Sequence, residues 1–176
     1  IKGSAAINLD GENIKFPTDV NKLWTECELG IVIAKKCNDI NENQSFDVIK
    51  GFVVCGDVTC ENIHKRDWHL AFSKSRKNFC PVSRDFRKIE KNQLNYLEIK
   101  TFINNEIVQY GNTSDMIYSP LKSVSYISSL IQLQENDLIL TGTPSFLKQN
   151  EPTLLNVGDK ISHQISNLKA LEYEIS

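Results

Sequence analysis

The chain has 176 residues, 40% of them hydrophobic, which is enough for one globular domain with a sizeable core. Its 22 acidic and 20 basic residues give a net charge of −2, and no basic block stands out, so we expect no nucleic-acid partner. No apolar stretch approaches the roughly 20 residues of a membrane-spanning helix. The first residues also lack a signal-peptide pattern, so we expect no membrane association.

Cysteine usage indicates the redox compartment. The 5 cysteines are an odd number, are unevenly spaced and fall partly in apolar segments, which favours reduced, buried thiols over a disulfide framework. They are Cys27, Cys37, Cys55, Cys60 and Cys80. We therefore expect an intracellular protein, either cytoplasmic or mitochondrial.

Short runs rich in β-branched residues predict strands along the whole chain. The predicted strands cover 29–34, 51–55, 97–103, 106–110, 138–141 and 160–165. The polar interval 35–46 reads as a turn-rich connection between the first two. Asn104 and Asn105 tolerate the positive φ of a tight primed turn, so the third and fourth strands are expected to form a hairpin.

One helix is well marked near the C-terminal third. Ser119 is a good N-cap, Pro120 suits the first helical position, and Leu121, Val124 and Ile131 follow at helical spacing. A shorter helix is expected over about 60–72. Because strands dominate and helices interrupt them irregularly, the sequence predicts an α+β, mainly β fold and not a repeated βαβ unit.

Two glutamates lie one residue apart in the segment WTECELGIVI, residues 24–33. In an extended strand Glu26 and Glu28 leave the same face, while Cys27 and Leu29 point to the other. Two like charges this close repel each other unless something positive lies between them. A solvated strand face is the plainer interpretation, and the pair alone does not decide between the two.

Asp57 adds a third carboxylate, directly after the predicted strand 51–55 and at the start of a loop, where functional residues often occur. Three converging carboxylates would form an oxygen-only site suited to Mg²⁺ or Mn²⁺. A competing zinc site could use Cys55, Cys60 and His64. Their spacing matches no common zinc pattern, and a fourth ligand is missing.

Five motifs in this order and spacing resemble the fumarylacetoacetate hydrolase family, over nearly the whole chain. The motifs are ECELGIVIAKKC, GFVVCGDVT, SKSRKNFCPVS, QYGNTSDMIYS and NDLILTGTP. The stretch DWHLAFSKSRKNFCPVS is similar to the acylpyruvase and oxaloacetate decarboxylase branch. The resemblance implies a mixed β-roll with a few helices, with residues 1–176 as one catalytic domain, and a homodimer. It also implies Mg²⁺ or Mn²⁺ held by Glu26, Glu28 and Asp57.

The resemblance further implies a reaction. The cation would chelate two oxygens of a 2-oxo or β-dicarbonyl acid, and acylpyruvate hydrolysis or oxaloacetate decarboxylation would proceed through a metal-stabilised enolate. Lys74 matches the family's catalytic lysine, and Thr143 in TGTP matches the threonine that contacts the substrate carboxylate. Asp115 and Ser114 are expected to organise the loop before the helix. Oxaloacetate keto–enol tautomerisation is an alternative activity.

The chain departs from the family pattern after the metal aspartate, where Glu61 and His64 replace an Arg and a Gln. His64 could donate a hydrogen bond to substrate in place of the Gln. Glu61 reverses a charge near the site unless it faces away or pairs with Lys65 or Arg66. The segment SFLK after TGTP replaces a glycine-rich one, so the pocket is expected to differ in shape.

A further difference concerns the general base, a His–Glu pair that the family carries in an HxxE segment on a lid helix. None of His64, His69 and His163 lies in such a segment, and we expect the lid upstream of Ile1, outside this sequence. With a lid, the protein would be a hydrolase or decarboxylase. Without one, the metal site could still support decarboxylation or tautomerisation. The other alternative is a family member with weakened catalytic activity that serves as a metal-binding structural dimer.

Overall fold

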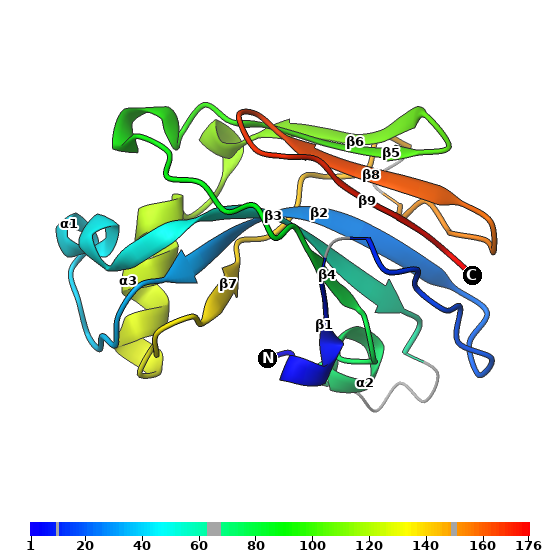
Figure 1. Ribbon diagram of the computed structural model, residues 1–176, viewed down its shortest axis with the longest axis horizontal. Helices are drawn as coiled ribbons and strands as arrows, with labels where there is room; N and C mark the ends of the chain where they lie inside the picture. The colour runs from blue at the N-terminus through cyan, green and yellow to red at the C-terminus, as the bar shows by residue number, and fades with distance from the viewer. Residues whose placement is uncertain (10, 63–67, 149–150) are drawn as a thin grey trace.

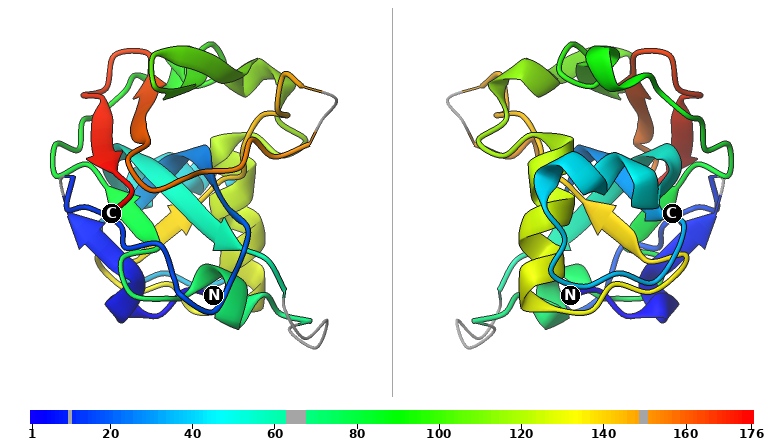
Figure 2. Two further views of the ribbon diagram at one scale, coloured as in Figure 1. Left: turned by 90° about the vertical axis from the view of Figure 1, so that its right-hand side faces the viewer. Right: turned by 90° about the vertical axis from the view of Figure 1, so that its left-hand side faces the viewer.

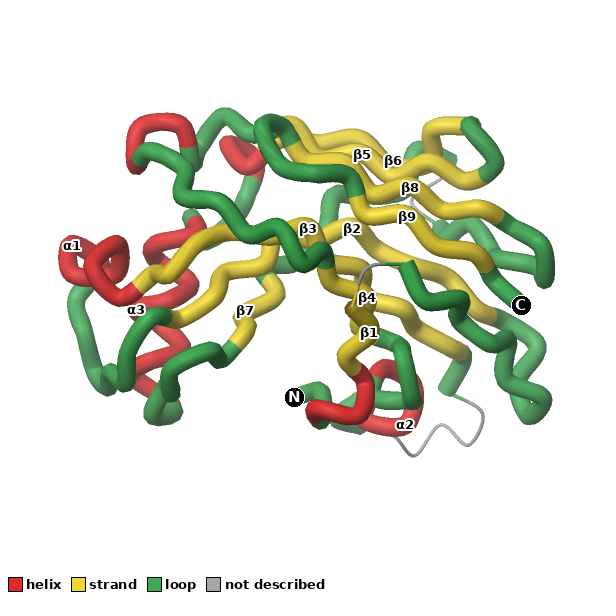
Figure 3. Tube along the Cα trace, viewed as in Figure 1, coloured by secondary structure: helices red, strands yellow, loops and turns green. Residues whose placement is uncertain are grey.

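Two β-sheets stacked on each other form the body of the protein (Figures 1 and 3). A computed structural model describes residues 1–9, 11–62, 68–148 and 151–176. The strands are β1 (Ile7–Leu9), β2 (Leu23–Ile33), β3 (Ile49–Cys60), β4 (Cys80–Val82), β5 (Glu98–Ile103), β6 (Glu106–Asn112), β7 (Leu138–Leu140), β8 (Lys160–Ile165) and β9 (Leu171–Glu174). The α+β, mainly β class predicted from the sequence is confirmed.

The first sheet has the strand order β1-β4-β3-β2-β7, and the second has β6-β5-β8-β9. The long central strands β2 and β3 are antiparallel, with Glu26 opposite Asp57 and Cys27 opposite Gly56. Strands β1 and β4 are parallel, whereas the second sheet is antiparallel throughout. The β2–β3 pairing therefore brings the carboxylates of two strands to one place in the sheet.

The main hydrophobic core lies between the two sheets, because β2 and β3 pack against β5 and β8. Leu23, Cys27 and Leu29 point from β2 into this core and are fully buried. A smaller apolar cluster covers part of the opposite face of the first sheet; it contains Ala6, Val53, Cys55, Cys80 and Val82. Strand alternation places Glu26 and Glu28 on this opposite face, as the sequence predicts.

Three α-helices occur in the described part of the chain: α1 (Glu42–Ser45), α2 (Ala71–Lys74) and α3 (Pro120–Leu130). Helix α3 packs beside α1 at one end of the molecule, while α2 lies near the N-terminus (Figures 1 and 2). Leu121, Val124 and Ser128 form the buried side of α3. Each helix is too short to cross a membrane, as far as the described residues go.

The N-terminus of α3 is capped as predicted. The Ser119 Oγ accepts a hydrogen bond from the backbone N–H of Lys122 at 3.1 Å and donates one to Glu42 Oε1 at 3.2 Å. We expect Ser119→Ala to lower the free energy of unfolding by about 1 kcal/mol, because an N-terminal amide loses its acceptor. Urea unfolding tests this, with Ser119→Asn as the control that retains a cap. Equal stability of the Ala and wild-type chains would contradict the cap's role.

The predicted strands all occur, and Asn104 and Asn105 form the hairpin turn with φ of 50° and 70°. The strands β1, β4 and β9, with 3 or 4 residues each, were not predicted. The equally short β7 was, because its residues form a continuous apolar run. The predicted connection 35–46 contains α1, which begins with a capping box between Asn41 and Gln44.

Three boundaries were wrong. The strand predicted over 29–34 begins earlier, because β2 runs from Leu23 to Ile33. Asp57 does not follow its strand, because β3 continues to Cys60 along its long partner β2. The helix expected over 60–72 cannot begin at Cys60, which is still in β3, and the described residues show only α2, the short helix Ala71–Lys74. Residues 63–67 lie outside the described part. The mutual pairing of β2 and β3, which local sequence does not reveal, determines how far both strands extend.

Candidate active site

Three carboxylates from the two central strands converge on the outer face of the first sheet. Glu26 and Glu28 come from β2 and Asp57 from β3, and each offers an oxygen within 4.8 Å of the others. Glu28 and Asp57 are buried and Glu26 is half-buried. The solvated strand face considered for the two glutamates is therefore not what the fold provides.

Lys74 lies directly against these carboxylates. Its Nζ is 2.6 Å from Asp57 Oδ2 and 3.1 Å from Glu26 Oε2, reached from the last residue of α2. Burial alone would lower the pKa of Lys74, but hydrogen bonds and charges from Asp57 and Glu26 outweigh it and raise the pKa. Lys74 is therefore a cation, and it is the positive group that the closely spaced carboxylates require.

A second lysine, Lys2, approaches Asp57 from the N-terminal segment. Its Nζ is 2.8 Å from Asp57 Oδ1, and it also donates to the backbone carbonyls of Lys74 and Phe79, the latter at 3.0 Å. Lys2 thus joins the N-terminal segment to the residues that carry the site. Sequence reasoning missed it, because nothing in IKGSAAI distinguishes this lysine from a surface residue.

Glu28 is the most enclosed of the three carboxylates. Burial and the negative charge of Asp57 raise the pKa of Glu28 to about 7, against the stabilising hydrogen bond from the backbone N–H of Gly142. Gly142 has φ of +90°, a conformation that favours glycine. The loop 141–144 is fastened further by Thr141, whose Oγ1 donates to the Leu29 carbonyl at 2.9 Å.

This donor set fits a hard divalent cation. All three groups offer carboxylate oxygens, the ligands that Mg²⁺ and Mn²⁺ prefer. After burial, the charges of Asp57 and Glu26 are what raise the pKa of Glu28, so the three carboxylates repel one another. The zinc alternative is disfavoured, because Cys55 and Cys60 are an odd number of residues apart on β3 and so point to opposite faces.

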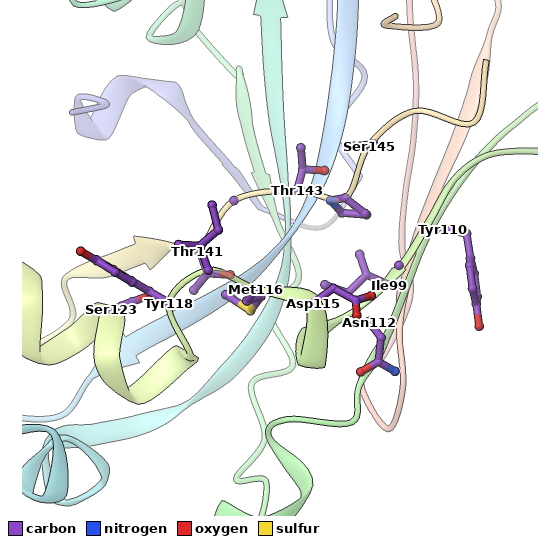
Figure 4. Close-up of a pocket in the computed structure, with 14 residues that line it drawn as sticks. Ile99, Tyr110, Asn112, Asp115, Met116, Tyr118, Ser123, Thr141, Thr143 and Ser145 are labelled. Carbon is purple, nitrogen blue, oxygen red and sulfur yellow. The ribbon is translucent and has the colours of Figure 1, made fainter. Parts of the chain in front are cut away.

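A cavity of about 710 Å³ lies beside the loop 141–144 (Figure 4). Thr141, Gly142 and Thr143 line it, together with Asp115, Met116 and Tyr118 from the segment before α3. Since Gly142 also binds Glu28, the same loop borders both the carboxylates and the cavity. The three carboxylates and Lys74 do not themselves line the cavity, and Gly142 is the contact that links the two.

Gln109 is a buried residue that sequence reasoning missed, and it holds Thr143 in place. Its Nε2 donates to Thr143 Oγ1 at 3.0 Å and to the Pro144 carbonyl at 2.7 Å. Its Oε1 accepts from Thr101 Oγ1 at 2.7 Å and from the Cys27 N–H at 3.3 Å. The only sequence signal was a polar residue in a strand that is otherwise partly apolar.

The hydrogen-bonded chain continues into the core between the sheets. His163 Nδ1 lies 3.1 Å from Thr101 Oγ1, and its Nε2 lies 3.1 Å from Thr25 Oγ1 and 2.9 Å from the Tyr173 hydroxyl. Thr25 and Tyr173 are themselves 2.7 Å apart. Burial lowers the pKa of His163 to about 3, so the ring is neutral.

We expect this burial to make stability depend on pH. The unfolded chain protonates His163 below its ordinary pKa of 6.5, whereas the folded chain does so only near 3, so acid favours unfolding between these values. Over this range the stability of wild type should fall by up to about 1.4 kcal/mol more per pH unit than that of His163→Gln. Urea unfolding of both chains between about pH 4 and about pH 8 measures the difference; parallel curves would argue against a buried neutral histidine.

The structure also bears on the other residues that the sequence analysis named. His64 lies outside the described residues, as do Lys65 and Arg66. Glu61 accepts a hydrogen bond from the Asn21 N–H at 2.5 Å. Ser114 organises the turn before α3 as expected, since its Oγ donates to Asp115 Oδ1 at 3.3 Å.

The model of the fumarylacetoacetate (FAA) hydrolase C-terminal family matches residues 1–176. The chain therefore belongs to the fumarylacetoacetate hydrolase family, which confirms the resemblance seen in its motifs. It is 34% identical over 148 residues to human mitochondrial oxaloacetate tautomerase FAHD1, covering 82% of this chain and 67% of that protein. It is 35% identical over 150 residues to the mitochondrial oxaloacetate decarboxylase of Dictyostelium discoideum, covering 82% and 69%.

Solved structures share the fold. A 2-hydroxyhepta-2,4-diene-1,7-dioate isomerase from Mycobacterium marinum superposes with a TM-score of 0.91 at 30% identity, covering 99% of this chain and 66% of that one. A fumarylpyruvate hydrolase from Pseudomonas aeruginosa, in complex with Mn²⁺ and pyruvate, gives 0.86 at 21% identity, covering 99% and 76%. The chain thus spans about two thirds of the length of the curated relatives and of the isomerase.

Proposed function

We propose that this chain is the catalytic domain of a divalent-metal-dependent enzyme that acts on 2-oxo and β-dicarbonyl acids, among them oxaloacetate and acylpyruvates. The observation that carries the proposal is the convergence of Glu26, Glu28 and Asp57 beside Lys74 and a cavity. The names of the relatives, which act on oxaloacetate, support the substrate class.

Glu26, Glu28 and Asp57 would hold Mg²⁺ or Mn²⁺. The cation, when bound, supplies Lewis acidity to two neighbouring oxygens of a 2-oxo acid. The complex of a fold relative with Mn²⁺ and pyruvate supports this assignment. Lys2, through its ion pair with Asp57, keeps that carboxylate oriented toward the site.

Lys74 is the proposed catalytic residue. Negative charge develops on the 2-oxo oxygen when the neighbouring bond breaks or a proton leaves, and a nearby ammonium group stabilises that charge. The raised pKa keeps Lys74 protonated for this role and makes it a poor general base. Thr143 is the proposed contact for the substrate carboxylate, and His64 stays a predicted substrate-binding residue.

Two types of reaction are candidates for this site. Hydrolysis or decarboxylation, with cleavage of a C–C bond, follows from the motif resemblance and from the decarboxylase relative. Keto–enol tautomerisation of oxaloacetate is favoured by a specific observation, the 34% identity to a protein named oxaloacetate tautomerase. Both reactions place negative charge on the same ketone oxygen, so the proposed residues serve either one.

The test is a substrate panel on the full chain with added Mg²⁺ or Mn²⁺. Loss of the ultraviolet absorbance of enol-oxaloacetate reports tautomerisation, pyruvate formation from oxaloacetate reports decarboxylation, and pyruvate formation from acetylpyruvate reports hydrolysis. We expect metal-dependent acceleration of at least one reaction, abolished by chelation. No acceleration of any of the three would overturn the proposed function.

We also propose a homodimer, located in the cytoplasm or mitochondria. Apolar side chains remain exposed along α3 and the segment before it, and a partner subunit could cover them. They are Ile117, Tyr118, Tyr126, Leu130 and Ile131. Size-exclusion chromatography with light scattering should give a mass twice that of the 20.0 kDa chain, and the mass of a single chain would contradict the dimer.

A further inference from the structure

We infer that Gln109 is a positioning residue for substrate binding: its amide fixes the hydroxyl of Thr143 as a hydrogen-bond donor directed into the cavity. The inference rests on the proposed function, in which Thr143 contacts the substrate carboxylate. It assigns a function to a buried residue on β6 that does not itself line the cavity.

A β-bulge places Gln109 where it can do this. Along the β5–β6 pairing, Phe102 lies opposite Ile107 and Thr101 opposite Gln109, so Val108 is an extra residue without a partner. Val108 and Gln109 are both buried, and the bulge interrupts the regular alternation that would send neighbouring side chains to opposite faces. The bulge therefore turns the amide of Gln109 toward the loop 141–144 instead of toward solvent.

The orientation of the amide is fixed by its neighbours. The Cys27 N–H can only donate, so the atom 3.3 Å from it is the amide oxygen of Gln109. The Pro144 carbonyl can only accept, so the atom 2.7 Å from it is the amide nitrogen. A flipped amide would oppose both groups. The nitrogen therefore donates its second hydrogen to Thr143 Oγ1 at 3.0 Å.

The donor and acceptor roles of the buried hydrogen bonds behind Gln109 agree with this orientation of its amide. Thr101 must donate to Gln109 Oε1, because a carbonyl-type oxygen only accepts, so Thr101 Oγ1 in turn accepts from His163 Nδ1–H. His163 Nε2 is then the acceptor that faces Thr25 and Tyr173. Burial lowers the pKa of His163 and keeps the ring neutral, so one ring nitrogen donates and the other accepts.

The consequence falls on Thr143. Its oxygen accepts the Gln109 hydrogen, so its own hydrogen points away from the amide, and Thr143 is half-buried at the wall of the cavity. A substrate carboxylate can only accept hydrogen bonds. Because the Thr143 hydroxyl hydrogen already points away from Gln109, the hydroxyl can donate to the carboxylate without first having to reorient. Without Gln109, the hydroxyl is free to turn toward the Pro144 carbonyl or other acceptors.

The test is a double-mutant cycle of Gln109→Met and Thr143→Val in the full chain, with KM and kcat measured for the accelerated oxaloacetate reaction and Kd for pyruvate with Mn²⁺. We expect Thr143→Val to raise KM and the pyruvate Kd by about 10-fold, the loss of one hydrogen bond to a charged group. Gln109→Met should raise them about 3- to 10-fold in wild type, but less than about 2-fold with Thr143→Val present.

Two controls separate positioning from general structural damage. In a Thr143→Ser background, which keeps the hydroxyl, Gln109→Met should raise KM as it does in wild type. Thermal unfolding of each variant shows whether it is folded. If Gln109→Met does not fold, Gln109→Glu is used: the introduced carboxyl can donate only while protonated, so KM should rise with pH relative to wild type.

The outcomes distinguish the inference from the proposed function. If Thr143→Val raises KM but Gln109→Met does not, or raises it equally in both backgrounds, the positioning role of Gln109 is wrong and the substrate contact stands. If Thr143→Val leaves KM and the pyruvate Kd unchanged, the proposed contact of Thr143 fails and the inference fails with it.

Discussion

An Asp57→Asn variant is expected to lose at least about 100-fold in kcat/KM for whichever oxaloacetate reaction the wild type accelerates. Replacing a residue that only supports a metal ligand lowers metal affinity or activity by about 10- to 100-fold, so replacing a direct carboxylate ligand should lower activity at least as much. Asp57 is also the carboxylate that both Lys2 and Lys74 contact, which makes it central to the charge balance of the site. Initial rates with saturating Mg²⁺ measure the loss.

The matched control is Asp47→Asn, an exposed aspartate in the short turn Phe46–Val48. It removes the same charge from the same chain and should leave kcat/KM unchanged. Circular dichroism must show that Asp57→Asn is folded, since the two lysines lose part of their counter-charge. A folded Asp57→Asn protein with wild-type kcat/KM would remove Asp57 from the site.

A Lys74→Met variant is expected to lower kcat by about 10²- to 10³-fold, the usual cost of removing one group that stabilises charge in a transition state. Binding of Mn²⁺ should persist or tighten, because the ammonium group that lies 2.6 Å from Asp57 and 3.1 Å from Glu26 competes with a cation for the same oxygens. Steady-state kinetics and a Mn²⁺ titration on the same preparation separate the two effects.

Lys77→Met serves as the control, because Lys77 is exposed three residues further along and should change neither quantity. Loss of Mn²⁺ binding in Lys74→Met would indicate that the lysine holds the site together and does not act on the substrate. An unchanged kcat would show that Lys74 is only a counter-ion for the carboxylates.

The sequence predicts well what depends on short-range pattern. The two-residue alternation places Glu26 and Glu28 on one face, and the cap at Ser119 marks the start of α3; both occur as expected. The hairpin at Asn104 and Asn105 follows from the positive φ that these residues tolerate.

Features that depend on distant partners were beyond the sequence. Asp57 belongs to β3 and not to a loop, because eleven residues of β2 hold the strand extended to Cys60. Lys2 reaches Asp57 across 55 positions of sequence, and no local pattern encodes that ion pair. Gln109 faces inward only because Val108 bulges out of register.

The central claim is that Glu26, Glu28 and Asp57 hold one divalent cation. Electron paramagnetic resonance of Mn²⁺ titrated into the full chain tests it most directly, because bound Mn²⁺ loses the sharp signal of the free ion. We predict that the free signal stays suppressed until one equivalent is added for each chain, and that Asp57→Asn abolishes this suppression while Asp47→Asn does not. A free signal that rises from the first addition to wild type would contradict the account.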